Sequence, residues 1–232
     1  DYIGHQFGPQ SVEVEDCYLR IDKDIAELLK FLDEWVGKNN MLLFLTADHG
    51  ASEAVPCLQK KNIDAGVIHE KMISDSLKIF LLHMYKDTIP LIVNDFDVYF
   101  DRKKIEFKKH NFNEIRKSAA AYLSKLNGIA DVMTSDEIQT EFFASQEDSV
   151  CSKVKAGFYP ERSGDVIFVL KRGWLEGYAK GTTHGSPYSY DTHVPLLWWG
   201  YTVSPGNTEE ELNITQIAST ISTMLKIPVP QG

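Results

Sequence analysis

The chain has 232 residues, of which 43% are hydrophobic and 25% are charged, so its composition is that of a globular domain and excludes a disordered segment. Its 33 acidic and 24 basic residues give a formal net charge of -9. A chain this acidic repels the phosphate backbone of nucleic acids unless it has a local basic patch, and the sequence shows none. We therefore expect no nucleic acid polymer among its partners.

Three cysteines, Cys17, Cys57 and Cys151, lie far apart and form no Cys-x-x-Cys pair. The sequence therefore predicts neither a thiolate zinc site nor a disulfide framework. No apolar run approaches the ~20 residues that a membrane-spanning helix needs, so we expect no membrane span.

The first part of the chain has the pattern of a helix followed by a buried strand. Apolar residues recur at helical spacing from Ile21 to Val36, and Gly37 stands where a C-terminal cap belongs. Residues 41–45 form a short uninterrupted apolar run, which is typical of a strand covered on both faces in a parallel sheet. Further strands of the same sheet are expected at residues 77–82, 166–170 and 194–198.

Between residues 84 and 164 the pattern changes to short alternating runs at 91–93 and 98–107, with a helical pattern at 113–126. Basic residues interleave with Ile105 and Phe107, so we interpret them as the solvated face of a strand: Arg102, Lys103, Lys104, Lys108 and Lys109. A final helix is expected after Asn213 as N-cap, with Gln216 three residues on.

The first candidate for chemistry is Asp48-His49-Gly50, placed where the apolar run 41–45 ends. Ligands gather at the carboxyl ends of strands in open parallel sheets, and an adjacent carboxylate and imidazole at that point can ligate divalent metals. Gly50 lets the backbone turn away sharply. A hydrogen-bonded Asp–His pair that caps the following segment explains the same residues equally well.

Two further groups contain histidines next to glycines. Asp1 and His5 are four residues apart, a spacing that places both side chains on one face of a helical turn. His184 lies between Thr183 and Gly185 in a loop before residues 194–198, where it has room to reach a ligand. His193 abuts the entrance to that strand, so we expect it to pack or to orient a neighbouring ligand by a hydrogen bond.

Taken together, these motifs resemble one family. Asp-x-x-Gly-His, then Ala-Asp-His-Gly after a strand, then Thr-His-Gly-Ser followed by Tyr-Asp-Thr-His-Val-Pro are similar to the phosphate-irrepressible alkaline phosphatases. They also resemble the type I phosphodiesterases and nucleotide pyrophosphatases, which belong with them to the alkaline phosphatase superfamily. The resemblance runs from Asp1 to Pro228 and is weakest from residue 84 to 157.

The resemblance implies a site for two zinc ions. Asp1, His5 and His184 would hold one ion, and Asp48 and His49 would contribute to the other. Three nitrogen and oxygen ligands leave the open position that a catalytic zinc requires. In the family, an upstream aspartate and a nucleophilic Thr or Ser complete the second site. This chain has no match for either, so the catalytic nucleophile is not expected within it.

The resemblance also implies the fold. We expect an α/β fold with a mostly parallel sheet and helices on both faces, truncated at the N-terminus and carrying a small α+β insertion. Residues 1–83 would form the first part of a metal-binding α/β core. Residues 84–164 would form a smaller lobe or insertion, and residues 165–232 would form the second part of the core.

The implied function is hydrolysis of phosphate monoesters through a covalent phospho-Thr or phospho-Ser intermediate, by in-line transfer between two zinc ions. The chain would be the C-terminal part of this enzyme, inactive by itself. The intact protein would be periplasmic or otherwise extracytoplasmic.

Two other functions stay open. One is a phosphodiesterase or nucleotide pyrophosphatase of the same superfamily, although the loop from Gly181 to Asp191 matches the monoesterases better. The other is a non-catalytic metal-binding or interaction module, which would need no nucleophile. A sheet without its central strands would leave apolar edges uncovered, so a dimer through these edges is then expected.

Overall fold

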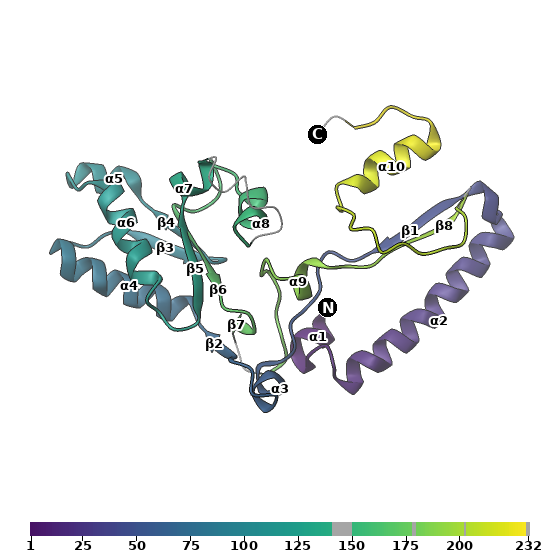
Figure 1. Ribbon diagram of the computed structural model, residues 1–232, viewed down its shortest axis with the longest axis horizontal. Coiled ribbons are helices and arrows are strands. Elements are labelled where there is room, and N and C mark those ends of the chain that lie inside the picture. Colours follow the sequence, from purple (N-terminus) through teal and green to yellow (C-terminus); the bar gives the residue numbers. More distant parts are fainter. Residues whose placement is uncertain (141–149, 178–179, 202, 231–232) are drawn as a thin grey trace.

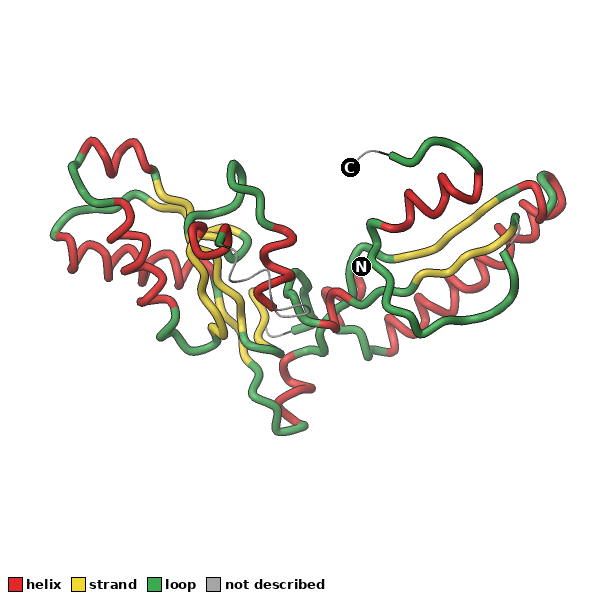
Figure 2. The backbone as a smooth tube through the Cα atoms, turned by 45° about the horizontal axis from the view of Figure 1, so that its top comes forward, coloured by secondary structure: helices red, strands yellow, loops and turns green. Residues whose placement is uncertain are grey.

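A computed structural model describes residues 1–140, 150–177, 180–201 and 203–230. Figure 1 shows two regions joined through a narrow middle. The first region holds α2 (Val12–Trp35), β1 (Leu42–Thr46), β8 (Leu196–Gly200) and α10 (Gln216–Leu225). The second region is a four-stranded sheet with its helices. The middle contains three short helices, α1 (Tyr2–Phe7), α3 (Val55–Lys60) and α9 (Ser189–Thr192), and Figure 2 shows the same division from a second direction.

The long helix predicted from residue 21 to 36 is confirmed as α2 and begins earlier, at Val12. Ser11 starts it, because its Oγ accepts a hydrogen bond from the Val14 N–H at 3.3 Å. Beyond its end, Gly37 has a φ of 83°, the left-handed conformation that glycine adopts at low cost after a helix. The short helix η1 (Lys38–Asn40) then leads into β1.

The strands predicted at 41–45 and 194–198 exist as β1 and β8, but they are antiparallel partners, with Leu42 opposite Gly200 and Thr46 opposite Leu196. The α/β class is confirmed, but the predicted strand direction differs, because most of the paired strands are antiparallel. Among the described strands, only β2 (Gly66–Ile68) and β7 (Trp174–Glu176) pair in parallel. A short apolar run indicates burial but not strand direction, which long-range connections decide.

The strand expected at residues 77–82 is instead part of the helix α4 (Glu70–Tyr85). Ile73, Leu77 and Leu81 are buried at intervals of four residues, the spacing of one helical face. Ile79 and Leu82 are exposed, so the apolar run that suggested a strand mixes buried and exposed positions. A short apolar run cannot distinguish a strand from a helix by itself.

The basic stretch also differs from its predicted form. Of the run 98–107, only its start is a strand, β4 (Asp97–Phe100), which pairs with β3 (Leu91–Asn94). The rest is the helix α5 (Arg102–Phe107), because Asp101 caps it by accepting a hydrogen bond from the Lys104 N–H at 3.0 Å.

The four-stranded sheet has the order β3-β4-β6-β5 with antiparallel neighbours. Its strand β6 (Val166–Leu170) is buried throughout and joins this sheet, not the sheet of β1 as predicted. Phe168 and Leu170 of β6 pack into the larger core with residues of α4 and of α6 (Phe112–Leu123). Ile167 and Val169 pack into a second core beside α7 (Ser135–Gln139) and α8 (Val150–Gly157). Helices therefore cover both faces of this sheet.

Two further predicted helices are present, with small differences at their ends. The helix predicted at 113–126 is confirmed as α6, and the last helix as α10, whose N-cap is Thr215 and not Asn213. The Asn213 N–H instead donates to Gln216 Oε1 at 2.7 Å in the preceding turn. The domain boundaries at residues 83 and 164 stay a prediction, and residues 141–149 of the predicted lobe lie outside the described residues. In the described part of the chain, no helix is long and apolar enough to cross a membrane.

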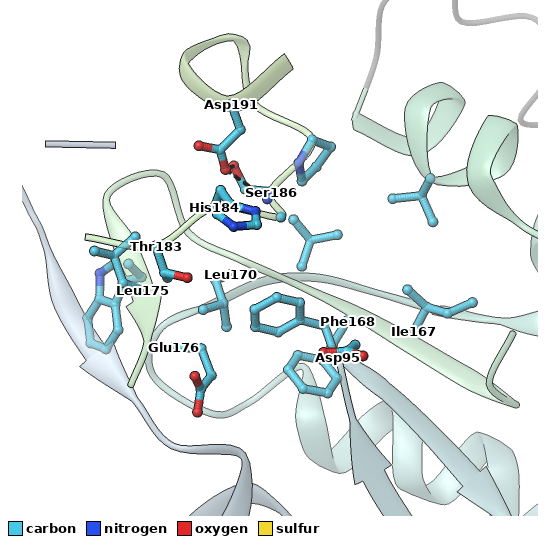
Figure 3. Close-up of a pocket in the computed structure, with 16 residues that line it drawn as sticks. Asp95, Ile167, Phe168, Leu170, Leu175, Glu176, Thr183, His184, Ser186 and Asp191 are labelled. Atoms are coloured by element: carbon cyan, nitrogen blue, oxygen red, sulfur yellow. Dashed lines mark hydrogen bonds between the residues drawn. The ribbon is translucent and has the colours of Figure 1, made fainter. Parts of the chain in front are cut away.

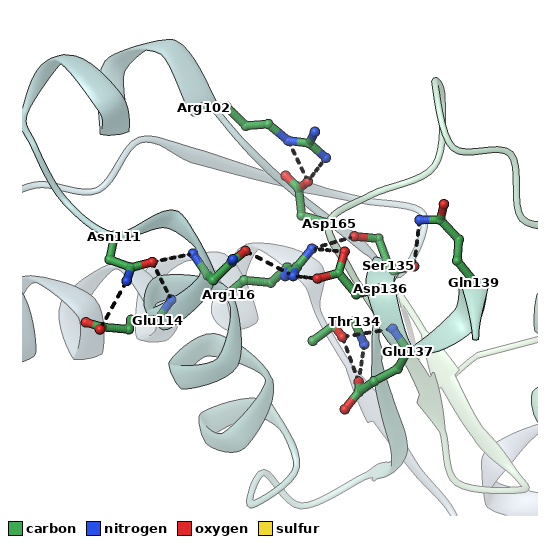
Figure 4. Close-up of polar contacts among 11 residues, drawn as sticks. Arg102, Asn111, Glu114, Arg116, Thr134, Ser135, Asp136, Glu137, Gln139 and Asp165 are labelled. Atoms are coloured by element: carbon green, nitrogen blue, oxygen red, sulfur yellow. Dashed lines mark hydrogen bonds and ion pairs between the residues drawn. The ribbon is translucent and has the colours of Figure 1, made fainter. Parts of the chain in front are cut away.

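Arg116 of α6 is a buried cation that joins this helix to the start of α7, which directly follows β5 (Ile129–Thr134). Its guanidinium donates to Ser135 Oγ at 3.0 Å and to Asp136 Oδ1 at 2.8 Å, and its second Nη forms an ion pair with the same carboxylate (Figure 4). A charged hydrogen-bonded pair of this kind is costly to break, because the partner that stays behind is buried without compensation.

We expect Asp136→Ala to lower the free energy of unfolding by about 1–3 kcal/mol, since it leaves the Arg116 guanidinium short of acceptors. Urea denaturation measures the change. The control is Asp22→Ala at an exposed position of α2, which should stay within about 0.5 kcal/mol of the parent. Equal stability of the two variants would contradict the role given to this ion pair.

Candidate metal centre

Asp48 and His49 lie in the loop that follows β1, as predicted. The neighbouring Gly50 donates its N–H to the Asp191 carbonyl at 2.7 Å. A Cβ at position 50 would lie 2.1 Å from the Tyr190 carbonyl oxygen, so only glycine permits this contact. The loop after β1 is therefore held against the short helix α9.

α1 places Asp1 and His5 on one face, with His5 Nε2 3.2 Å from Asp1 Oδ1. The backbone of this helix contacts the loop that carries His184. The Thr182 N–H donates to the His5 carbonyl at 3.2 Å, and the His5 ring contacts the Thr182 carbonyl through Nδ1 at 2.9 Å. Gly181 makes the approach feasible: its φ is 75°, and a Cβ there would lie 1.8 Å from the His5 carbonyl oxygen.

A third contact joins the same loop to the loop after β1. The buried Thr182 hydroxyl donates to the Ser52 carbonyl at 2.6 Å. Figure 1 accordingly shows the N-terminus and α1 close to the segment that leads into α9. Segments from the start, the first quarter and the last quarter of the chain thus meet through backbone atoms.

These contacts bring the predicted ligands together. One possible ligand atom from each of Asp1, His5 and His184 lies within 4.8 Å of the others. The His49 ring stacks on the His184 ring, with centroids 3.4 Å apart, and His49 Nε2 is 3.6 Å from Asp1 Oδ1. Asp48 lies at the exposed edge of this group, 3.8 Å from His49 Nε2. The structure therefore gathers all five predicted residues.

The orientation of two rings suits metal binding. Nδ1 of His5 lies 2.9 Å from the Thr182 carbonyl, and Nδ1 of His49 lies 2.8 Å from the Gly50 carbonyl. Because a carbonyl oxygen only accepts hydrogen bonds, Nδ1 carries the proton in each neutral ring and Nε2 is left as an acceptor. Metal-binding histidines commonly have this arrangement.

The two free Nε2 atoms face the Asp1 carboxylate, so acceptors face each other across short distances. Such a cluster of acceptors favours the binding of a cation. Burial, followed by the proximity of His49 and His5, lowers the pKa of His184 and favours its neutral form. A neutral imidazole is the form that ligates zinc, so the donor set fits this metal.

His193 behaves differently from its predicted role. It follows α9, its side chain is exposed, and its N–H donates to the Ser189 carbonyl. Exposure argues against packing at the strand entrance, and an orienting role stays a prediction.

Asp191 belongs to the Tyr-Asp-Thr-His motif, and the sequence alone predicts no role for it. The residue is buried, and its Oδ2 accepts hydrogen bonds from the Ser186 N–H at 2.8 Å and from the Ser186 hydroxyl at 2.6 Å. Burial raises its pKa, which these two hydrogen bonds partly offset. Figure 3 shows Asp191 and Ser186 beside His184, so Asp191 holds the loop on which His184 sits. The spacing in the sequence offers a weak signal for this role, because Asp191 follows Ser186 by five residues and lies close enough along the chain to accept its hydrogen bonds.

A family model, type I phosphodiesterase / nucleotide pyrophosphatase, matches residues 1–194. The chain belongs to this family. It is 38% identical over 233 residues to the alkaline phosphatase PafA of Elizabethkingia meningoseptica, and 36% identical over 232 residues to the alkaline phosphatase PhoV of Synechococcus elongatus. These matches cover 100% of this chain but 42% and 41% of the two relatives. The crystal structure of wild-type PafA superposes with a TM-score of 0.92 at 37% identity, covering 100% of this chain and 44% of that one.

Gly181→Ala is expected to reduce zinc affinity by about tenfold or more, because the added Cβ forces the His184 loop away from α1. Isothermal titration with zinc measures the change, and circular dichroism checks that the protein is folded. Gly206→Ala is the matched control, since a Cβ there meets nothing within 4 Å. Unchanged zinc affinity in folded Gly181→Ala protein would contradict the proposed contact.

Proposed function

We propose that this chain is the C-terminal part of a zinc-dependent phosphatase that hydrolyses phosphate monoesters through a covalent phospho-Thr or phospho-Ser intermediate. The observation that carries the proposal is the convergence of Asp1, His5 and His184 within 4.8 Å, with His49 stacked beside them. The relatives support it, since those matched over less than half of their own length include two alkaline phosphatases. The nucleophile would lie upstream of Asp1, in the part of the relatives that this chain does not cover.

In this proposal Asp1, His5 and His184 hold one zinc ion, and Asp48 and His49 contribute to a second. When bound, the two ions supply positive charge that activates the attacking oxygen and stabilises the leaving oxygen of the ester. The chain's own contribution is geometric. The backbone carbonyls of Thr182 and Gly50 fix the proton on Nδ1 of His5 and His49, so that both Nε2 atoms face the same space.

The buried parts of the loops keep this geometry rigid. The hydrogen bond of the Thr182 hydroxyl is buried, and the bond from the Ser186 backbone to the buried Asp191 is partly buried. Such supporting contacts hold ligands in position before the metal binds and so reduce the cost of binding it. The chain would orient the phosphoryl group, while the upstream part supplies the attacking hydroxyl.

Two other functions are distinguishable from this one. A phosphodiesterase or nucleotide pyrophosphatase is favoured by the family whose model matches residues 1–194. A non-catalytic metal-binding module would use the same ligands without a nucleophile.

The proposal also includes the location and the oligomeric state. We propose that the protein lies in the periplasm or another extracytoplasmic compartment, which cell fractionation tests. We also propose a dimer through exposed sheet edges, which light scattering tests.

His184→Ala is expected to lower zinc affinity at least about tenfold, because it removes one of three ligands of the first ion. Zinc content after dialysis and competition with a chelator measure this effect. His83→Ala, at an exposed position of α4, is the control and should bind zinc like the parent. If His184→Ala retains the parent's stoichiometry and affinity, His184 is not a ligand.

The 232-residue chain alone should show no zinc-dependent turnover of p-nitrophenyl phosphate, whereas a protein that also contains the upstream residues should hydrolyse it. A higher kcat/KM for this monoester than for bis-p-nitrophenyl phosphate is expected, and the reverse order would support the diesterase. Turnover by the short chain would show that the nucleophile lies within it. Zinc binding without turnover by either protein would support the non-catalytic module.

A further inference from the structure

A cavity of about 120 Å³ extends from His184 along the strands β6 and β7. Figure 3 shows its arrangement: His184 lies on one side, Phe168 and Leu170 form the wall beyond it, and Glu176 and Asp95 lie on the opposite side. The volume is close to that of apolar cavities of about 150 Å³ that hold a single benzene ring. Neither the predicted zinc ligands nor the proposed phosphoryl chemistry explains why this space is present.

The cavity is continuous with the candidate metal centre, because His184 belongs to both. A phosphoryl group held at Asp1, His5 and His184 therefore lies beside the cavity. Its ester oxygen carries an organic group that must occupy some neighbouring space. The cavity is such a space.

The wall of the cavity is apolar and firmly packed. Phe168, Leu170 and Leu175 are almost fully buried, and Phe96 meets Phe168 edge to face with centroids 5.8 Å apart. Trp174 is also part of the wall, and its indole ring packs against glycines. A Cβ at Gly66 or Gly128 would lie 2.8 Å or 2.3 Å from this ring. An apolar or aromatic group that enters this space removes its own surface and that of the wall from water.

The polar groups of the cavity favour one kind of charge. Asp95 and Glu176 contribute two carboxylates, and neither forms an ion pair with a described lysine, arginine or histidine. The buried Trp174 Nε1–H has no acceptor among the described residues, so a neutral oxygen on a ligand could satisfy it. Glu176 is only partly exposed at the edge of this apolar space, so its charge is screened less than in bulk water, and together with the exposed Asp95 it repels a second anion on the ligand.

We propose that this cavity receives the organic group of the phosphate ester and selects uncharged or cationic groups with aromatic or apolar character. Asp95 and Glu176 exclude esters whose organic part carries a further negative charge. This inference rests on the proposed phosphatase function, because it assigns the ester's organic group to a space beside His184.

The test uses the zinc-loaded protein that also contains the upstream residues. Two substrates of similar size are compared, 4-(hydroxymethyl)phenyl phosphate, whose substituent is neutral, and 4-carboxyphenyl phosphate, whose substituent is an anion. The double variant Asp95→Asn/Glu176→Gln should raise the ratio of kcat/KM for the anionic ester to kcat/KM for the neutral ester about three- to tenfold. The control Asp22→Asn/Glu27→Gln changes the net charge equally at exposed positions of α2 and should alter neither value.

A second variant tests the space itself. Val154→Phe narrows the cavity from α8. It should lower kcat/KM for 2-naphthyl phosphate about tenfold, while methyl phosphate, which does not reach the cavity, is hydrolysed as by the parent. Isothermal titration calorimetry with 2-naphthol measures occupancy of the cavity without any turnover. We expect the parent protein to bind 2-naphthol and the Val154→Phe variant not to bind it.

The outcomes separate the two proposals. If no phosphate ester is hydrolysed but 2-naphthol binds and Val154→Phe abolishes its binding, the phosphatase function fails and the cavity stands as a site for aromatic groups. If the esters are hydrolysed but neither variant changes selectivity, the assignment of the cavity is overturned and the phosphatase function stands. Failure of 2-naphthol to bind also overturns the cavity proposal.

Discussion

The candidate metal centre depends on the close approach of two backbone segments that are 177 residues apart. The Thr182 N–H donates to the His5 carbonyl, and the His5 ring contacts the Thr182 carbonyl in return. Gly181 permits this approach because no side chain stands between the segments. The relative positions of Asp1, His5 and His184 therefore follow from main-chain contacts and not from flexible side chains, which is how a binding site becomes ordered before its ligand arrives.

Electrostatics explain why such an ordered group attracts a cation. Two Nε2 atoms and the Asp1 carboxylate face one another, while both Nδ1 atoms are committed to carbonyl oxygens. Acceptors held this close create a negative potential that attracts a positive charge into the space between them. The structure holds the loops that carry them with hydrogen bonds, those of Thr182 and Asp191 in particular.

The two regions of the chain contribute different parts of the proposed chemistry. The loop after β1 and the helix α1 supply ligands, whereas β6 and β7 supply an apolar wall. His184 lies where the two meet, since it is both a candidate ligand and part of the cavity. Recognition of phosphate and recognition of the organic group would thus be carried by separate structural elements, so that one can change without the other.

The sequence by itself determined what depends on local pattern: the long helix α2, the strands β1, β6 and β8, and the three histidine-containing motifs with their ligand candidates. The tertiary structure decided the rest. It made β1 and β8 antiparallel, turned residues 77–82 into part of α4 and gave Asp191 its supporting role. Periodicity is written in neighbouring residues, but strand direction, sheet membership and the shape of a cavity arise from contacts between segments far apart in the chain, which no local pattern encodes.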